Sequence, residues 1–111
     1  MGLFDFIMGS KEEISKFTDI GMGMSIRDLI FRMSRTSKKT EVMGYHQALK
    51  IKFNNLANEG ADDYELIDYF NMAFDRNTHT EMGKNAMFPV MQRRGLAHKE
   101  GGYICRDYDH N

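Results

Sequence analysis

The sequence contains a single cysteine, Cys105, among its 111 residues. One thiol cannot form an internal disulfide and suits a reducing compartment, so we expect the protein in the cytoplasm. No apolar run approaches the ~18 residues that a transmembrane helix needs, which argues against contact with a membrane. There is no excess of basic residues either, because the net charge is −1. Any binding to nucleic acid must therefore use a local basic patch.

The first residues match neither of two common targeting signals. N-myristoylation requires Ser or Thr at the sixth position, where this chain has Phe6. A secretory signal needs a basic start and a longer apolar run. The hydrophobic (41%) and charged (28%) contents are those of a soluble globular protein. A chain of this length buries roughly two-thirds of its unfolded surface, so we expect residues 1–111 to form one domain.

Hydrophobic spacing predicts two helices in the N-terminal part, residues 1–39. The apolar positions of residues 3–18 keep heptad spacing and predict an amphipathic helix. Residues 21–25 contain two spaced glycines, which either cradle phosphate or link two helices. The dinucleotide fingerprint wants glycine at Ile26 and a preceding buried strand, so we favour a flexible link that ends in the helix cap Ser25. A helix over residues 26–37 follows.

Capping residues mark three further helices. Thr40 is expected to cap a helix over residues 41–58, which Gly60 ends. Asp62 and Glu65 form a capping box for the next helix, which ends near Asp75. The apolar faces of these two helices are Val42, Tyr45, Leu49, Phe53 and Leu56, and Leu66, Ile67, Phe70, Ala73 and Phe74.

The last helix begins after Thr80 and ends at Gly95, with an apolar face formed by Met82, Ala86, Met87, Val90 and Met91. Pro89 removes a helical hydrogen bond, so the helix either kinks near Asn85 or starts a fresh turn at Pro89. Residues 96–99 and 103–106 then predict two strands. Gly101 and Gly102 suit the tight turn between them. An isolated hairpin is marginally stable, so this one must pack on the helices.

The order of helix, turn, helix and hairpin resembles the winged helix-turn-helix family. In that family the recognition helix ends in a basic residue, Gly and Leu before the wing, and this chain has Arg93-Arg94-Gly95-Leu96. The resemblance implies a mainly α fold, with a helical N-terminal part (1–39) followed by a winged helix-turn-helix with a short C-terminal β-hairpin (40–107). Three features depart from the family pattern: Pro89 within the recognition helix, Glu81 at its start, and a strongly acidic preceding helix.

The resemblance also implies which residues would contact DNA. The recognition helix of the family enters the major groove, and the wing contacts the backbone or the minor groove. Transferred by position, the groove-facing residues are Thr78, His79, Thr80, Lys84 and Asn85. The implied phosphate contacts, which give affinity without sequence readout, are Arg93, Arg94, His98, Lys99 and Arg106.

Charge is segregated along the chain. The net charge is +5 over residues 25–52, −6 over residues 59–75 and +3 over residues 81–99. Such runs either form solvated helix faces or build a basic face opposite an acidic one. The ten methionines are either adaptable core residues or a forgiving partner surface.

Two functions agree with these features. The first is a small DNA-binding regulatory protein, with the N-terminal helices forming a homodimer or partner surface. The alternative is a non-enzymatic interaction module, such as a small inhibitor or adaptor, that binds a protein partner, because winged helices also serve as protein-binding modules.

We expect no enzymatic activity, metal or cofactor. His98, Cys105, Asp107 and His110 suggest a metal site or a Cys–His pair, but structural zinc sites need paired short ligand spacings that a lone cysteine does not provide. A cysteine nucleophile would also need a histidine in hydrogen-bond reach and an orienting partner. Adjacent carboxylates at residues 62 and 63 are explained by capping at a helix start.

Overall fold

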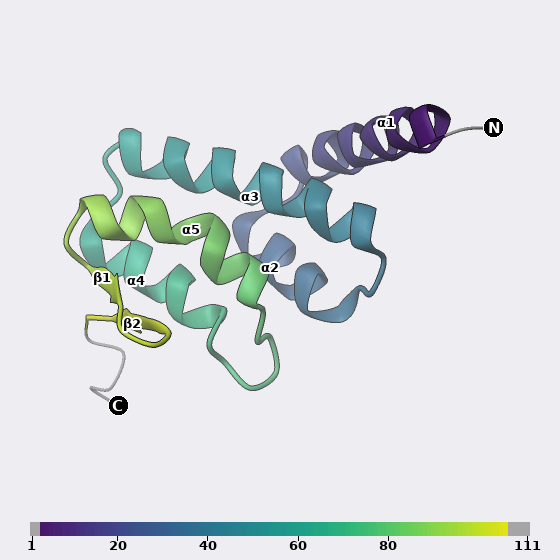
Figure 1. Cartoon of the computed structure of the whole chain (residues 1–111). Coiled ribbons are helices and arrows are strands. Elements are labelled where there is room, and N and C mark those ends of the chain that lie inside the picture. The colour runs from purple at the N-terminus through teal and green to yellow at the C-terminus, as the bar shows by residue number, and fades with distance from the viewer. Residues whose placement is uncertain (1–2, 107–111) are drawn as a thin grey trace.

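A computed structural model of the chain describes the backbone of residues 3–106 and the side chains from Ser10 onward (Figure 1). Over this range five helices precede a two-stranded antiparallel sheet. The elements are α1 (Leu3–Met22), α2 (Ile26–Arg35), α3 (Lys39–Asn58), α4 (Asp63–Met72), α5 (Glu81–Arg93), β1 (Ala97–Lys99) and β2 (Tyr103–Cys105). The expected fold class, mainly α with a short C-terminal hairpin, is confirmed.

Three of the predicted helix caps are confirmed. The backbone N–H of Asp28 donates to Ser25 Oγ over 3.1 Å at the start of α2. At the start of α4, the N–H of Glu65 donates to Asp62 Oδ1 over 2.8 Å. The hydroxyl oxygen of Thr80 accepts from the N–H of residue 83 over 3.1 Å. In each case a side-chain oxygen satisfies a backbone donor that the helix itself leaves unpaired.

The ends of α3 and α5 also follow from the sequence. Gly60 and Gly95 adopt φ values of 97° and 70°, a left-handed conformation that glycine reaches without steric cost. The prediction of a cap at Thr40 is wrong, because α3 begins at Lys39 after Lys38. The Thr40 hydroxyl instead donates to a carboxylate oxygen of Glu13 on α1.

The first helix is longer than expected, because α1 continues through Gly21 to Met22. Gly21 is buried, and a Cβ on it would lie 2.7 Å from the Cβ of Ala48 on α3. This glycine therefore permits close helix packing instead of forming a loop. Helix α4, by contrast, is shorter than expected. It stops at Met72, and turns replace its predicted last residues up to Asp75.

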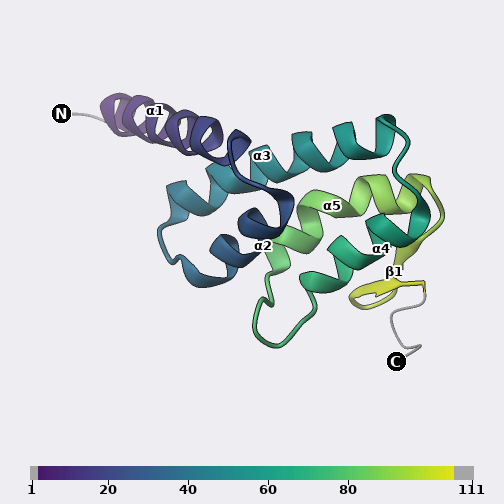
Figure 2. The same ribbon diagram turned by 180° about the vertical axis from the view of Figure 1, so that it is seen from behind.

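Helix α3 is the centre of the packing. It contacts α1 along one side, and α2 and α5 elsewhere (Figures 1 and 2). The N-terminal end of α1 projects beyond the other helices in both views. The largest fully buried side chains come from four of the helices and the residue before β1: Leu29, Ile30, Tyr45, Leu49, Phe53, Leu66, Phe70, Met87, Met91 and Leu96. The predicted homodimer through the N-terminal helices stays a prediction.

Helix α5 passes through Pro89 as one continuous element. A fresh turn beginning at Pro89 is therefore the wrong alternative. Pro89 is exposed, whereas its neighbours Phe88 and Val90 are buried. The proline thus lies on the outer face of α5, where its ring displaces no core side chain.

The hairpin packs on the helices, as expected. Its strands pair with Ala97 opposite Cys105 and Lys99 opposite Tyr103, and Gly101 has a φ of 76° in the turn. The Tyr103 ring lies 4.9 Å from that of Phe88 and 6.4 Å from that of Phe70, measured between centroids. Across residues 3–106, no helix combines the length and apolar character that crossing a membrane requires.

Candidate nucleic-acid interface

Three of the expected groove-facing residues have buried or half-buried side chains. Thr80 and Lys84 are buried, with 6% and 5% of their surface exposed. The half-buried Thr78 donates its hydroxyl to the carbonyl of Met72 over 2.5 Å. The prediction that Thr80 and Lys84 face a groove is therefore wrong, because the first turns of α5 rotate these side chains toward the protein interior.

The buried Lys84 ammonium is held by two neighbours. Its Nζ donates to Glu81 Oε1 over 2.9 Å and lies 4.2 Å from the centroid of the Phe74 ring. The hydrogen bond from Lys84 holds the pKa of Glu81 below its ordinary value, and the charges of Lys84 and of the exposed His79 add to this effect. His79 Nε2 lies 3.2 Å from the same Glu81 oxygen. Glu81 and its two partners thus form one small polar cluster.

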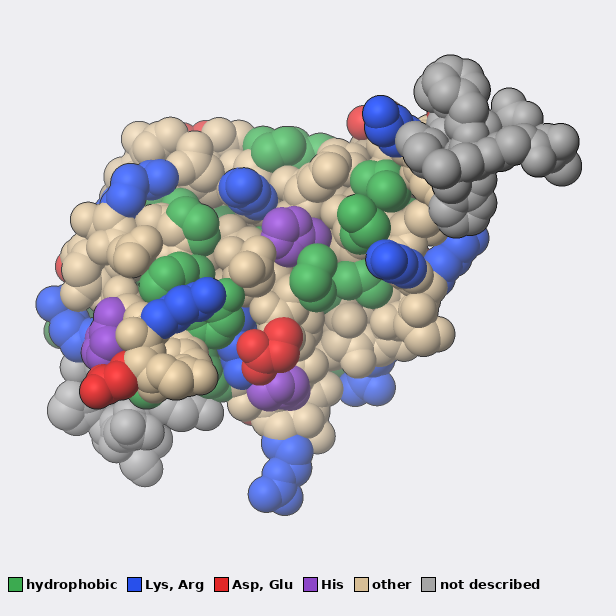
Figure 3. Space-filling model, in the orientation of Figure 1, with side chains coloured by type: hydrophobic (Ala, Val, Ile, Leu, Met, Phe, Trp, Pro, Cys, Tyr) green, Lys and Arg blue, Asp and Glu red, His purple; other side chains and the backbone are tan. Residues whose placement is uncertain are grey.

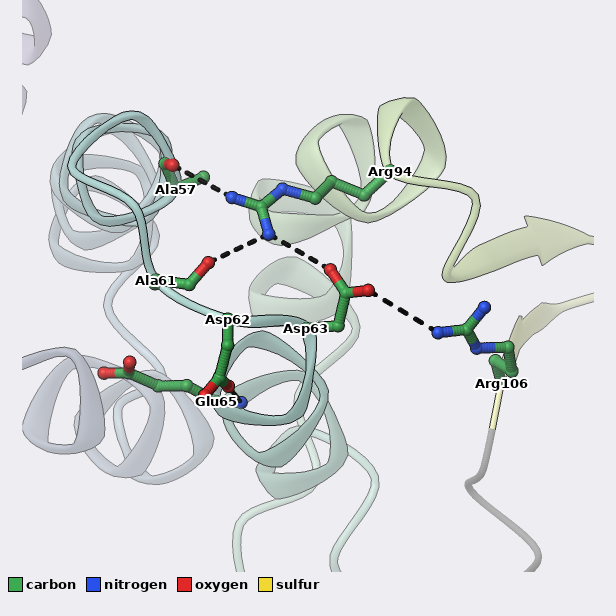
Figure 4. Close-up of polar contacts among 7 residues, drawn as sticks. All are labelled: Ala57, Ala61, Asp62, Asp63, Glu65, Arg94 and Arg106. Carbon is green, nitrogen blue, oxygen red and sulfur yellow. Dashed lines mark hydrogen bonds and ion pairs between the residues drawn. The ribbon is translucent and has the colours of Figure 1, made fainter.

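Arg94 connects the end of α5 to the segment between α3 and α4 (Figure 4). Its Nη1 donates to the carbonyl of Ala61 over 2.9 Å and to Asp63 Oδ1 over 3.1 Å, and its Nη2 donates to the carbonyl of Ala57 over 3.0 Å. Arg106 Nη2 approaches the other oxygen of Asp63 at 3.6 Å. Arg94 is half-buried and its guanidinium is occupied, so it stabilises the fold instead of being available to phosphate.

Two side-chain hydrogen bonds join α3 to α5. His46 Nε2 lies 2.9 Å from Asn85 Oδ1, and Arg93 Nη2 donates to Asn54 Oδ1 over 2.8 Å. Both pairs are 39 residues apart in sequence, which means that the two helices run side by side in the same direction.

Between these two bonds, Lys50 lies one helical turn from His46 and from Asn54, and Pro89 lies one turn from Asn85 and from Arg93. We name this strip the α3–α5 seam. Its members are His46, Lys50, Asn54, Asn85, Pro89 and Arg93.

The hairpin extends the seam on one side. The Asn85 amide donates to the Tyr103 hydroxyl over 3.2 Å, and Lys99 Nζ lies 4.8 Å from the centroid of the Tyr103 ring. Lys50, Arg93 and Lys99 are exposed. No member of the seam is acidic, and Figure 3 shows Lys and Arg side chains spread more widely over this face than Asp and Glu.

Of the two expected wing residues that remain, Arg106 approaches Asp63 at the start of α4, and His98 is exposed on β1. His98 Nε2 lies 3.4 Å from Glu100 Oε2, so its neighbour is a carboxylate. His46 and Lys50 are the members of the basic surface that the sequence prediction missed. Their four-residue spacing places His46, Lys50 and Asn54 on one face of α3, but only the packing of α3 beside α5 brings that face to the basic surface.

Two of the four residues considered for a metal site, Asp107 and His110, lie outside the described residues. Among residues 3–106, no group of three or more His, Cys, Asp or Glu side chains is arranged to hold a metal ion. Cys105 is buried, and its Sγ lies 3.3 Å from the carbonyl oxygen of Arg106.

No protein-family model, curated protein or solved structure matches the chain. The resemblance to the winged helix-turn-helix family therefore stays a prediction.

Proposed function

We propose that the protein is a small nucleic-acid-binding regulatory protein whose contact surface is the α3–α5 seam together with Lys99. The observation that carries the proposal is the combination of Lys50, Arg93 and Lys99, all exposed, around uncharged hydrogen-bonding side chains and without a carboxylate in the seam. Lys and Arg side chains bind phosphate and release its counterions. The order of the three helices and the hairpin, which is that of a winged helix-turn-helix, supports the same conclusion.

The proposed binding mode relies on the nucleic-acid backbone. Because Thr80 and Lys84 are buried, the start of α5 offers few side chains to base edges. Contacts from Lys50, Arg93 and Lys99 to phosphates position a protein without reading sequence. Asn85 has the chemistry for adenine recognition, but its amide already bonds His46 and Tyr103. We therefore expect weak sequence preference and strong salt dependence.

Fluorescence anisotropy of a labelled random-sequence DNA duplex tests this function. We expect binding at about 50 mM salt that weakens steeply by about 200 mM, because several counterions are released. The triple variant Lys50→Gln, Arg93→Gln and Lys99→Gln should reduce the slope of log K against log salt by about 2–3, since each phosphate that a cation no longer neutralises lowers the slope by about 0.9.

A matched control variant has the same net charge as the triple seam variant. Lys11→Gln, Lys16→Gln and Arg35→Gln remove three exposed cations from α1 and α2 and should leave the slope nearly unchanged. Absence of binding by the wild type at both salt concentrations would contradict the proposal.

Exposed methionines favour a protein partner as the second candidate. Met43 on α3 and Met82 on α5 are 36% and 38% exposed. Flexible thioether side chains adapt to different partner surfaces. Under this alternative, replacing both residues by Ser should abolish partner binding, whereas the triple seam variant should retain it at about 200 mM salt, where charge contacts are screened.

A further inference from the structure

A groove of about 650 Å³ lies between α2 and α4 and has no assigned role. Its volume falls within the roughly 300–1,000 Å³ typical of small-molecule sites. Residues from α2, α4 and the turn that follows α4 line it, and most of its lining is apolar. The groove shares no residue with the α3–α5 seam. Helix α5 lies in front of α4 in Figure 1, whereas Figure 2 presents α2 and α4 from the other side.

The charge of the groove is negative. Asp28, Asp68 and Asp75 line it together with Arg27, and the Arg35 guanidinium lies beside the lining residue Phe31. Arg27 comes from the basic segment 25–52, whereas Asp68 and Asp75 come from the acidic segment 59–75. The two segments therefore meet at this groove. A ligand that carries a positive charge would be attracted, and one that carries phosphate would be repelled.

The groove also offers an aromatic surface. Phe31 on α2 lines the groove, and 43% of its surface is exposed. The Arg35 guanidinium lies 4.1 Å from the centroid of this ring, so the ring already contacts one cation. The exposed remainder of the ring can cover the apolar part of a ligand, while the carboxylates bind its charged part.

The side-chain oxygen of Asn71, which also lines the groove, lacks a hydrogen-bond donor within residues 3–106. Its Oδ1 is buried and has no hydrogen-bond partner among the described residues. Buried polar atoms are normally satisfied, and an exception calls for an explanation. Asn71 lines the groove and stands between Asp68 and Asp75 in sequence, so the proposed ligand would supply the missing N–H if the Oδ1 atom turned toward it.

We propose that the groove between α2 and α4 binds a small organic cation, namely an amine carried on an aromatic or aliphatic body. The ammonium lies against Asp68 and Asp75 and donates to Asn71 Oδ1, and the body packs on Phe31. This site does not depend on the nucleic-acid function, because the two surfaces have no residue in common.

Titration of the ¹⁵N-labelled full-length chain with phenethylamine tests the site by NMR. We expect saturable amide shifts centred on the residues of the groove. The neutral analogue 2-phenylethanol, which has the same ring but no charge, should bind about fivefold to tenfold more weakly, as expected for the loss of two partly exposed ion pairs. Equal affinity of the two compounds, or shifts located elsewhere, would overturn the proposal.

Variants separate the site from a general effect of charge. Asp68→Asn with Asp75→Asn should weaken phenethylamine binding about fivefold or more, whereas the matched pair Glu12→Gln with Asp19→Asn on α1 should not change it. Asn71→Leu removes the unpaired acceptor at similar volume and should weaken amine binding without lowering the melting temperature. Weakening by the α1 pair to the same extent would show that only net charge acts. The variant Asp68→Asn with Asp75→Asn should still bind the DNA duplex. A failure of the amine-binding proposal can therefore be distinguished from a failure of the nucleic-acid proposal.

Discussion

Lys84 illustrates how far the surroundings of one side chain can change its role. A lysine near the start of a recognition helix is expected at the surface, where it reaches bases or phosphates. Here Phe74 and Glu81 provide the ring and the carboxylate that make burial of the ammonium tolerable. Glu81 is three residues from Lys84, so their pairing could be predicted from the sequence. The Phe74 ring is brought to Lys84 only by the turn between α4 and α5.

The Glu81–Lys84 pair predicts a pH-dependent stability. We expect Glu81→Gln to lower the free energy of unfolding at pH 7 by roughly 1–2 kcal/mol, less than for a fully buried pair because the carboxylate stays solvated. Since the pKa of Glu81 is lowered in the folded protein, its contribution is present above the ordinary value of 4.5 and is lost as the pH falls through the folded pKa.

Urea unfolding of both proteins between pH 7 and pH 3 measures this difference. The difference in unfolding free energy between wild type and Glu81→Gln should shrink as the pH falls below 4.5, the ordinary pKa of a glutamate. A gap that is constant over this range would mean that the loss arises from packing and not from charge.

Arg94 predicts a second loss of stability at a single residue. Its guanidinium donates to two backbone carbonyls and to Asp63, a forked geometry that an ammonium cannot reproduce. We expect Arg94→Lys to lower the free energy of unfolding by about 2–3 kcal/mol.

The neighbouring Arg93 offers the control, because it is exposed and makes a single bond to Asn54. Arg93→Lys should cost at most about 0.5 kcal/mol in the same urea titration. Equal losses for the two variants would contradict a structural role specific to Arg94.

At the scale of elements, the contact between α1 and α3 depends on Gly44. A Cβ on Gly44 would lie 2.4 Å from the Cβ of Phe17, 2.8 Å from the backbone nitrogen of Thr18 and 2.9 Å from the carbonyl oxygen of Ile14. Two of these atoms belong to the backbone of α1, so a side chain can be accommodated only if the helix moves.

Gly44→Ala should therefore destabilise the protein by about 1–3 kcal/mol, although alanine normally improves a helix interior by about 0.5–1 kcal/mol. Thermal unfolding followed by circular dichroism measures the effect. Gly23→Ala is the control, because its Cβ would meet only the carbonyl oxygen of Ile20 at 3.5 Å. A Gly44→Ala variant at least as stable as wild type would show that α1 is not packed against α3 in this way.

The ends of elements were predictable where a local interaction sets them. Ser25, Asp62 and Thr80 cap their helices through bonds to residues three positions away, and such bonds are visible in sequence. The end of α1 was not predictable, because Gly21 is required by a contact with Ala48 that is 27 residues distant. A glycine chosen for close packing cannot be distinguished locally from one chosen for a turn.

At the scale of the whole molecule, the candidate site was only partly predictable. The wing lysine and Arg93 lie at the surface as expected, but Arg94 does not contribute its guanidinium. His46 and Lys50 join the surface because α3 and α5 run parallel, which no local pattern determines. Arg27 and Asp68 line the same groove between α2 and α4, so charge segregation along the chain does not become segregation in space.

Mapping a DNA duplex onto the chain by NMR tests the central claim most directly. Titration of the ¹⁵N-labelled protein at about 50 mM salt should shift the amide signals of Lys50, Asn85, Arg93 and Lys99 together, because phosphate contacts persist at low ionic strength. The signals of Asp68 and Asn71 should stay in place. Shifts confined to α2 and α4, or no shifts at saturating duplex, would contradict nucleic-acid binding by the α3–α5 seam.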